Sequence, residues 1–356
     1  MRAWLLTGWL YFVASAFAAE RSGSPAPESS GCAIAWGETN VIAPRGGWGR
    51  MIKLTNGDWL CVTTRFAQTN SALQLQVSTN NARTWTRLGE VADGNRFLDN
   101  GELIQLPDGA VLLAGRSLIE AESYRLPVYR STDAGRSWTH WSNIDANEGP
   151  PGTLKARGLW EPHFYFLADG RLAGAYANEK HASAKPAFSQ VCSLKISPDL
   201  GRSWGEEITL AAERGGGKLR PGMPVVERMA NGRFLAVYEV VEIGDADVFY
   251  KISEDGEHWP EGLGTPIAGH HAGPWVTALK DGRLLLTSCA NGLSCSGDFG
   301  RTWQPLNLPA WDFGPGKVFT WPAIYEIQPG EVAVMVSRGG VHLRFGTLES
   351  KITRHR

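Results

Sequence analysis

The sequence predicts an all-β fold, a six-bladed β-propeller. Six segments share one pattern: an apolar strand, a turn that ends in glycine, and a second apolar strand. The turn glycines recur about every 50 to 60 residues, at Gly57, Gly109, Gly170, Gly232, Gly282 and Gly330. A second motif, Ser-x-Asp-x-Gly-x-x-Trp, recurs between these segments. Asn-Gly and Asp-Gly turns between apolar runs indicate β-hairpins, and a repeat of this length with several strands is typical of propellers. Six hairpins therefore predict six blades.

The residues before the repeats predict a signal peptide at 1–19. Arg2 is followed by an apolar stretch that reaches Phe17, and a small-x-small pattern ends at Ala18. We expect cleavage after Ala18 or Ala19, with an uncleaved anchor as the alternative. Residues 20–31 are rich in Ser, Pro and Gly and predict a flexible linker. The mature protein is therefore expected to be exported, either secreted or periplasmic.

The propeller is expected to span residues 32–350, followed by a tail at 351–356. No Ser-x-Asp-x-Gly-x-x-Trp motif follows Gly330 in the last blade. We therefore expect the segment from Cys32 to Ala43 to supply the outer strand of that blade. This pairing of an N-terminal strand with C-terminal strands closes the ring and leaves no open sheet edge.

The Ser-x-Asp motif resembles the Asp-box, a turn between the third and fourth strands of a propeller blade, best known from sialidases and related glycosidases. Full copies end at Trp138, Trp204 and Trp303, and degenerate copies end at Trp85 and Trp259. In such a turn the Asp carboxylate accepts hydrogen bonds, Gly supplies a positive φ, and Trp packs on the sheet. Asp-boxes lie at the periphery, so Asp133, Asp199 and Asp298 are expected to be structural.

Composition and cysteine usage limit the possible partners. The chain has 35 basic and 36 acidic side chains, so its charge favours neither nucleic acid nor an anionic membrane as a partner. Five cysteines leave at least one thiol unpaired, and a bridge between Cys289 and Cys295 is conceivable across the Asn-Gly turn between them. His270 and His271 are adjacent, so in a strand their side chains would face opposite sides and could not bind one metal ion. We therefore favour two loop residues over a metal site. We expect no bound metal. We expect the protein to be a monomer.

Polar and aromatic residues gather where the first and second strands of the blades meet the mouth of the central channel. Aromatic rings can stack on a sugar, and charged groups can bind its hydroxyls, although a generic polar rim is the alternative interpretation. The candidate substrate-binding residues are Arg50, Arg65, Asn100, Arg116, Trp160, His163, Glu179, Arg220, Trp321 and Arg338.

Two carboxylates at this mouth are the candidate catalytic pair. Glu161 begins blade three and Glu239 ends the second strand of blade four, so neighbouring blades can direct both into one pocket. Glycoside hydrolysis needs one carboxylic acid that protonates the leaving oxygen and a second carboxylate that attacks or activates water. Apolar neighbours such as Trp160 and Pro162 would raise the pKa of Glu161, and a nearby arginine would keep Glu239 ionised. Simple pairing of each carboxylate with a rim arginine is the alternative.

Most of the mature chain resembles the six-bladed exo-acting arabinanase family of glycoside hydrolases. The resemblance rests on "GRMIKLTNGDWL", "NGELIQLPDGAVLLAGR", "RGLWEPHFYFLADGRL" and "RPGMPVVERMANGRFLAVYE", together with the interleaved Asp-boxes. That family releases arabinobiose from the non-reducing end of α-1,5-arabinan with retention, using two glutamates. The resemblance implies that Glu161 is the acid/base, that Glu239 is the nucleophile, and that no organic cofactor is needed. The segment "PRGGWGR" departs from the family pattern between Arg45 and Arg50.

Two other functions stay open at this point. An exo-sialidase needs three arginines around the sugar carboxylate, which Arg50, Arg220 and Arg338 match in number only, and a tyrosine nucleophile. Tyr325 lies several residues down its strand, and no Arg-Ile-Pro motif is present. A glycan-binding propeller without catalytic activity would retain aromatic residues such as Trp321 but would not need both glutamates.

Overall fold

The computed structural model describes residues 32–67, 70–306, 309–311 and 320–349. The signal peptide expected at 1–19, the linker at 20–31 and the tail at 351–356 lie outside the described residues. The described residues all fall within one compact unit. Within the described ranges, no helix is long and apolar enough to cross a membrane.

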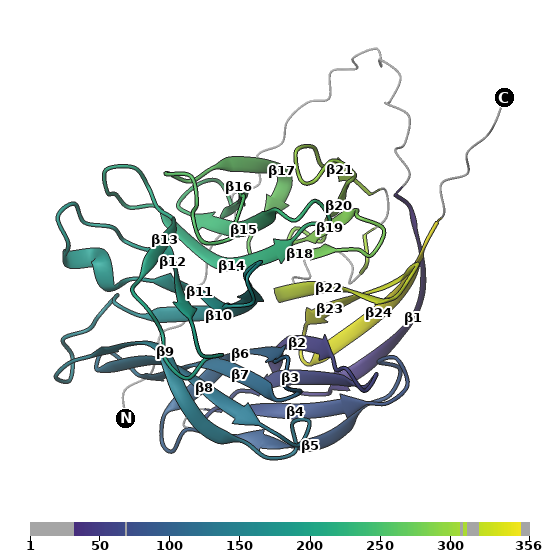
Figure 1. Ribbon diagram of the computed structural model, residues 1–356, viewed down its shortest axis with the longest axis horizontal. Coiled ribbons are helices and arrows are strands. Elements are labelled where there is room, and N and C mark those ends of the chain that lie inside the picture. The colour runs from purple at the N-terminus through teal and green to yellow at the C-terminus, as the bar shows by residue number, and fades with distance from the viewer. Residues whose placement is uncertain (1–31, 68–69, 307–308, 312–319, 350–356) are drawn as a thin grey trace, which may run out of the picture. The chain divides into compact units, whose positions relative to one another are not determined.

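The described residues form six four-stranded antiparallel sheets, as the sequence predicts (Figure 1). Each sheet is a blade, and its strands are given from the inner to the outer one. Blade 1 consists of β2 (Gly47–Lys53), β3 (Trp59–Arg65), β4 (Ala72–Ser78) and β5 (Thr86–Val91). Blade 2 consists of β6 (Phe97–Gln105), β7 (Val111–Ile119), β8 (Ser123–Ser131) and β9 (Thr139–Glu148). Blade 3 consists of β10 (Leu159–Phe166), β11 (Leu172–Asn178), β12 (Val191–Ser197) and β13 (Ile208–Ala211).

The second half of the unit repeats this arrangement. Blade 4 consists of β14 (Arg220–Arg228), β15 (Phe234–Val241), β16 (Asp247–Ser253) and β17 (Thr265–His271). Blade 5 consists of β18 (Trp275–Ala278), β19 (Leu284–Thr287), β20 (Leu293–Ser296) and β21 (Gln304–Pro305). Blade 6 consists of β22 (Thr320–Gln328), β23 (Glu331–Ser337), β24 (Val341–Leu348) and β1 (Ile34–Ala43). A short 3-10 helix, η1 (Lys180–Ser183), follows β11.

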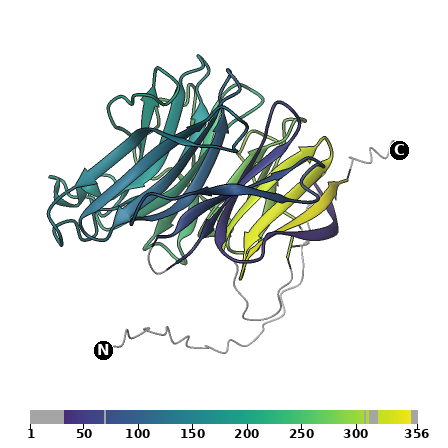
Figure 2. The same ribbon diagram turned by 90° about the horizontal axis from the view of Figure 1, so that it is seen from below.

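The inner strands define the ring. Strand β2 contacts β6, and the contacts continue through β10, β14, β18 and β22 back to β2 (Figure 1). Strand β1 pairs with β24, from Ile34 opposite Leu348 to Ala43 opposite Val341, so an N-terminal strand lies in the last blade (Figure 2). The ring therefore has no inner gap between its first and last blades.

The core lies between neighbouring blades rather than within one sheet. Strand β11 is buried at every position, whereas the outer strand β5 has a single buried position. One apolar cluster joins Leu112 of blade 2 to Phe164 of blade 3, and another joins Tyr165 of blade 3 to Phe234 of blade 4. Because both faces of a blade are covered, its inner strands are nearly continuously apolar instead of alternating.

The Asp-boxes stabilise turns at the periphery. Asp133 accepts hydrogen bonds from the backbone N–H of Ser137 (2.8 Å) and from its hydroxyl (2.6 Å). Gly135 has a φ of 87°, and its N–H donates to Ser131 (2.9 Å). Trp138 donates from its indole to Gly135 (3.0 Å). These bonds assign the motif a structural role, as the sequence predicts.

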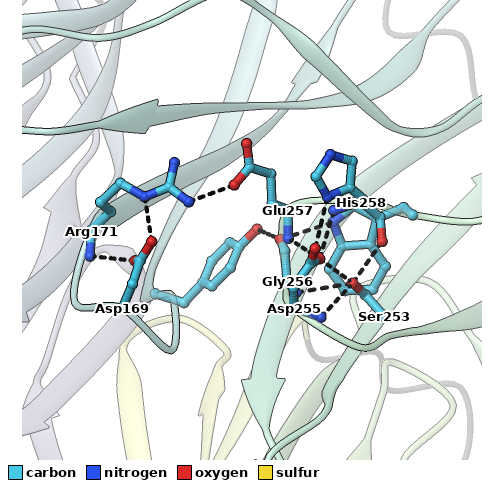
Figure 3. Close-up of polar contacts among 9 residues, drawn as sticks. Asp169, Arg171, Ser253, Asp255, Gly256, Glu257 and His258 are labelled. Carbon is cyan, nitrogen blue, oxygen red and sulfur yellow. Dashed lines mark hydrogen bonds and ion pairs between the residues drawn. The ribbon is translucent and has the colours of Figure 1, made fainter.

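The degenerate Asp-box of blade 4 also joins two blades (Figure 3). Asp255 accepts from the backbone N–H of His258 (2.8 Å) and pairs with its ring (2.7 Å). Arg171, in the hairpin turn of blade 3, binds both Asp169 and Glu257 at 2.6 Å. Hairpin turns and Asp-boxes therefore share one end of the blades, and the starts of the inner strands lie at the opposite end.

A disulfide joins Cys32, which precedes β1 of blade 6, to Cys295 of blade 5. The bridge considered from sequence between Cys289 and Cys295 is therefore wrong, and Cys61, Cys192 and Cys289 are free thiols. Spacing along the sequence favours disulfide partners that are close in the chain. Closure of the ring instead brings together two cysteines that are 263 residues apart.

Candidate active site

A left-handed residue recurs at the start of the inner strand in every blade. Its φ lies between 50° and 53°, at Trp48, Asn100, Glu161, Met223, Gly273 and Trp321. Five of these positions coincide with register shifts between the first and second strands, and the sixth, Gly273, precedes β18. A bulge of this kind redirects one side chain out of the normal strand alternation. These six positions form what we call the mouth ring, in which Glu161 is the only acidic residue.

Glu161 is held in the mouth ring by the neighbouring blade. Its Oε2 accepts a hydrogen bond from the backbone N–H of Met223, the mouth-ring residue of blade 4 (3.0 Å). Burial, together with the negative charge of Glu239, raises the pKa of Glu161 to about 8. At neutral pH the protonated acid is therefore the favoured form of Glu161.

Glu239 lies on β15, opposite Gly222 of β14. Its Oε2 accepts a hydrogen bond from the backbone N–H of Gly273, the mouth-ring residue of blade 5 (2.6 Å). Burial raises the pKa of Glu239, while the Gly273 N–H and the charge of Arg220 oppose that rise. The sequence predicts an arginine that keeps Glu239 ionised; Arg220 acts in that direction but does not outweigh burial.

The two carboxylates face one space above Gly222. A Cβ built on Gly222 would lie 3.6 Å from Oε2 of Glu161 and 3.8 Å from Oε1 of Glu239. The same Cβ would lie only 2.7 Å from the side-chain nitrogen of Gln190. The missing side chain at Gly222 therefore lets Gln190 and both carboxylates approach one point of the backbone.

Arg220 is positioned beside this space by two buried side chains. Its Nη2 donates to Glu179 (2.5 Å) and to Gln190 (3.0 Å). Glu179 also accepts a hydrogen bond from the backbone N–H of Gly158 (2.7 Å), and Gln190 donates to the Pro221 carbonyl (2.9 Å). Glu179 is therefore an anchor for Arg220 rather than an independent catalytic carboxylate.

On the other side of Glu161, Arg116 and Trp160 form a stacked pair. The Arg116 guanidinium lies 4.2 Å from the ring centroid of Trp160 and binds the Asp99 carboxylate through two nitrogens, at 2.7 and 2.5 Å. The charge of Arg116 opposes the rise in the pKa of Glu161. Trp160 is half-buried, so an edge of this stack is exposed at the mouth.

Arg50 lies beneath the mouth ring, where it is only 3% exposed. Its guanidinium is stacked between Trp48 and Trp275, 4.6 Å from each ring centroid. Nη1 donates to the carbonyls of Gly49 (2.7 Å) and Trp321 (3.2 Å). Arg50 thus packs beneath the mouth ring, whereas the half-buried Trp321 packs against Trp48.

His163 belongs to the same lower layer and does not contact Glu161. Its Nε2 lies 3.2 Å from the Val226 carbonyl, and its Nδ1 lies 3.6 Å from Glu102. Burial lowers the pKa of His163 to about 4, so the ring is neutral. The sequence places His163 on the same strand face as Glu161, but the bulge between Trp160 and His163 separates their directions.

Three predicted residues remain. Asn100 is a buried member of the mouth ring. Arg65 is directed to the outer strand, where it pairs with Glu90 at 3.3 Å, and so does not join the glutamates. Arg338 follows β23, and its backbone N–H donates to Gly340 (2.8 Å).

Sequence reasoning missed Asp99, Gln190, Gly222 and Gly273. The sequence does contain a signal for the mouth ring: a glycine or proline lies eight residues before each turn glycine. These residues are Gly49, Gly101, Pro162, Pro224, Pro274 and Pro322. The residue just before each of them is the left-handed member of the mouth ring. This spacing would have placed Gly273 in the ring, whereas nothing in the sequence brings Gln190 to Gly222. Among the described residues, no cluster of His, Cys, Asp or Glu could hold a metal ion.

No family model and no curated protein sequence matches the chain. Several solved structures are similar to the chain. A Fusarium graminearum α-L-arabinofuranosidase bound to an iminosugar inhibitor has a TM-score of 0.73 and 18% identity, over 88% of this chain and 98% of that one. A Penicillium chrysogenum α-L-arabinanase bound to arabinobiose has a TM-score of 0.72 and 21% identity, over 91% and 99%. A Hadza microbial sialidase has a TM-score of 0.60 and 13% identity, over 85% and 66%. At these identities the similarity shows a shared fold, and the chain is a six-bladed β-propeller of the kind found in these arabinofuranosidase, arabinanase and sialidase structures.

Proposed function

We propose that the protein is an exo-acting glycoside hydrolase that cleaves an arabinan-like polysaccharide with retention of configuration. The observation that carries this proposal is that Glu161 and Glu239, from neighbouring blades, both approach Gly222. The two carboxylates differ in their charged neighbours. The charge of Glu239 raises the pKa of Glu161 more than Arg116 lowers it, whereas Arg220 lowers the pKa of Glu239. Two glutamates with separated roles are what retaining hydrolysis requires.

In the proposed mechanism Glu239 attacks the anomeric carbon while Glu161 protonates the glycosidic oxygen. The bond between carbon and the leaving oxygen breaks, and the sugar becomes esterified to Glu239. Glu161, now ionised, removes a proton from water, and the resulting hydroxide displaces Glu239 from the sugar. The Gly273 N–H and Arg220 stabilise the carboxylate when it leaves.

The sugar preference rests on the shape of the mouth and on structural similarity. The Trp160 and Arg116 stack lies on one side of the glutamates, and Trp321 lies on the mouth ring. Aromatic faces of this kind pack against the C–H groups of a sugar ring. Arabinobiose is the ligand in the similar arabinanase structure, and this supports an arabinose-containing substrate.

A sialidase is less well supported by the arginines. Arg50 is covered by Trp48 and Trp275, and Arg220 is paired with Glu179. The hydroxyl of Tyr325 accepts a hydrogen bond from the backbone of Met51 (3.2 Å) in the lower layer, and burial raises its pKa. A binding-only propeller would not need two carboxylates at one ligand space.

We also propose that the mature protein is exported. The Cys32–Cys295 disulfide supports an oxidising compartment, in agreement with the signal peptide expected at 1–19.

Product analysis tests the proposed activity. The purified mature protein is incubated with linear α-1,5-arabinan and, in parallel, with a sialyl-lactose. Release of arabinobiose as the first product is expected from arabinan. Free sialic acid, or no product from arabinan, would overturn the proposal.

A further inference from the structure

A cavity of about 380 Å³ lies between the outer parts of blades 3 and 4. We call it the flank groove. It is bordered by β13, by the chain that follows it, and by the segment after the blade 4 Asp-box. Its lining includes Phe188, Arg214, Lys251, Trp259 and Glu261. Its volume falls within the usual range of small-molecule sites, about 300 to 1,000 Å³.

The base of the flank groove is built around Lys251, which is 4% exposed. Its ammonium donates to the carbonyl of Leu210 in blade 3 (2.9 Å) and to that of Pro260 in blade 4 (2.5 Å). Burial lowers the pKa of Lys251 to about 8. Lys251 therefore ties the two walls together and gives the base of the groove a fixed shape.

The groove combines aromatic surface with balanced charge. Phe188 and Trp259 are half-buried, and the indole of Trp259 is held by a hydrogen bond to Gly256 (3.1 Å). Arg214 and Glu261 are exposed at the rim, and neither has an ion-pair partner among the described residues. Opposite charges beside aromatic rings suit an uncharged ligand with many hydroxyl groups better than an anion.

A single wall separates the flank groove from the catalytic pocket. On the groove side, Phe188 is bridged to Gly217, and the Ser189 N–H donates to the Gly217 carbonyl (3.0 Å). On the pocket side, the next residue, Gln190, binds Arg220 (3.0 Å). Phe188 and Gln190 are two residues apart in one segment, so this segment links the groove to the surroundings of the glutamates.

We propose that the flank groove binds an internal segment of the same neutral polysaccharide whose end enters the catalytic pocket. This inference rests on the proposed function. A second point of attachment raises the local concentration of chain ends and lowers KM for the polymer. We expect a short oligosaccharide to occupy only the catalytic pocket, so its turnover should not depend on the groove.

The test compares polymer and oligosaccharide kinetics. Arg214→Ala combined with Glu261→Ala removes the rim groups, and Phe188→Ser removes an aromatic face. For both variants we expect KM on linear arabinan to rise about fivefold, with kcat on arabinan and both constants on arabinotriose unchanged. The control is Arg87→Ala combined with Glu254→Ala, two exposed residues of the same types elsewhere on the ring, which pair with Glu90 and Arg233. Unchanged KM on arabinan in both groove variants would overturn the inference and leave the proposed function intact.

Direct binding separates the inference from catalysis. The Glu239→Gln variant is run through native gels that contain linear arabinan or polygalacturonate. Internal segments far outnumber chain ends in arabinan, so retardation reports the groove. Arabinan is expected to retard this variant, and the Arg214→Ala and Glu261→Ala changes to abolish the retardation. Retardation by polygalacturonate alone, or by neither polymer, would overturn the inference even if wild-type protein releases arabinobiose.

Discussion

Glu161 and Glu239 acquire different tendencies to ionise from their immediate neighbours. Burial raises the pKa of both, but the charge of Glu239 is a further cause of the rise at Glu161. The first proton of the pair therefore leaves Glu239, which has the Gly273 N–H and Arg220 beside it. The division of roles follows from these partners rather than from the two side chains themselves.

The pH dependence of kcat/KM should follow this order. Glu161 must be protonated, so activity is expected to fall as pH rises through about 8. Glu239 must be ionised, so activity is expected to fall on acidification at a pH above the ordinary glutamate pKa of 4.5. Arg116→Gln removes a charge that opposes the pKa rise at Glu161, so it should move the alkaline limb to higher pH, while Arg116→Lys should not. An alkaline limb that is unmoved in Arg116→Gln would contradict the assignment of Glu161 as the acid.

Gly222→Ala tests whether substrate binds between the glutamates. The added methyl group would lie 2.7 Å from Gln190 and less than 4 Å from both carboxylates. We expect kcat/KM to fall by about 10- to 100-fold, with little change in the melting temperature. Gly89→Ala on β5, where a Cβ meets no atom within 4 Å, is the control. Full activity of Gly222→Ala would show that substrate lies elsewhere.

At the level of strands and turns, the hairpins were predictable because their signals are local. Each turn glycine, such as Gly109 with a φ of 87°, adopts a conformation that favours glycine, and the flanking apolar runs form the first two strands. The bulges at the mouth ring were not foreseen, because register is decided between strands. Their consequence is visible at His163, which the bulge turns away from Glu161 and towards Glu102.

The Asp-box turns should affect stability without affecting catalysis. Asp133→Ala removes the hydrogen bonds to Ser137, and we expect it to cost roughly 1–3 kcal/mol of unfolding free energy with kcat unchanged. Asp133→Asn should cost less, because Asn80 in the blade 1 copy still accepts from the Thr84 N–H (2.9 Å). Chemical denaturation beside a kinetic assay measures both quantities. A loss of kcat in folded Asp133→Ala would contradict a purely structural role.

For the ring as a whole, the sequence predicts six blades and a shared pocket, and it identifies most of the residues around it. It does not predict which arginine reaches which carboxylate. Arg65, Arg116 and Arg220 all end or begin strands near the mouth, yet only Arg116 and Arg220 influence the glutamates, because Glu90 holds Arg65 at the outer strand. Such choices depend on side-chain directions set by the blade twist and by pairing across blades.

The disulfide between blades 5 and 6 should stabilise ring closure. Cys32 and Cys295 are 263 residues apart in sequence, so their bridge restricts the unfolded chain strongly. We expect Cys32→Ala to lower the unfolding free energy by about 2–4 kcal/mol and to leave kcat unchanged, since Cys32 is remote from the glutamates in the fold. Thermal melts with and without reductant provide the measurement. Equal melting temperatures of wild type and Cys32→Ala under oxidising conditions would argue against this role.

Covalent trapping of the sugar on the nucleophile tests the proposed roles of Glu239 and Glu161 most directly. Glu161→Gln is incubated with an aryl arabinobioside whose leaving group needs no protonation, and the protein is then digested and analysed by mass spectrometry. Because the first step no longer needs an acid while the second still needs a base, an arabinobiosyl adduct should accumulate on the peptide that contains Glu239. An adduct on a different residue, or steady turnover with no adduct, would contradict the assignment of Glu239 as nucleophile and Glu161 as acid/base.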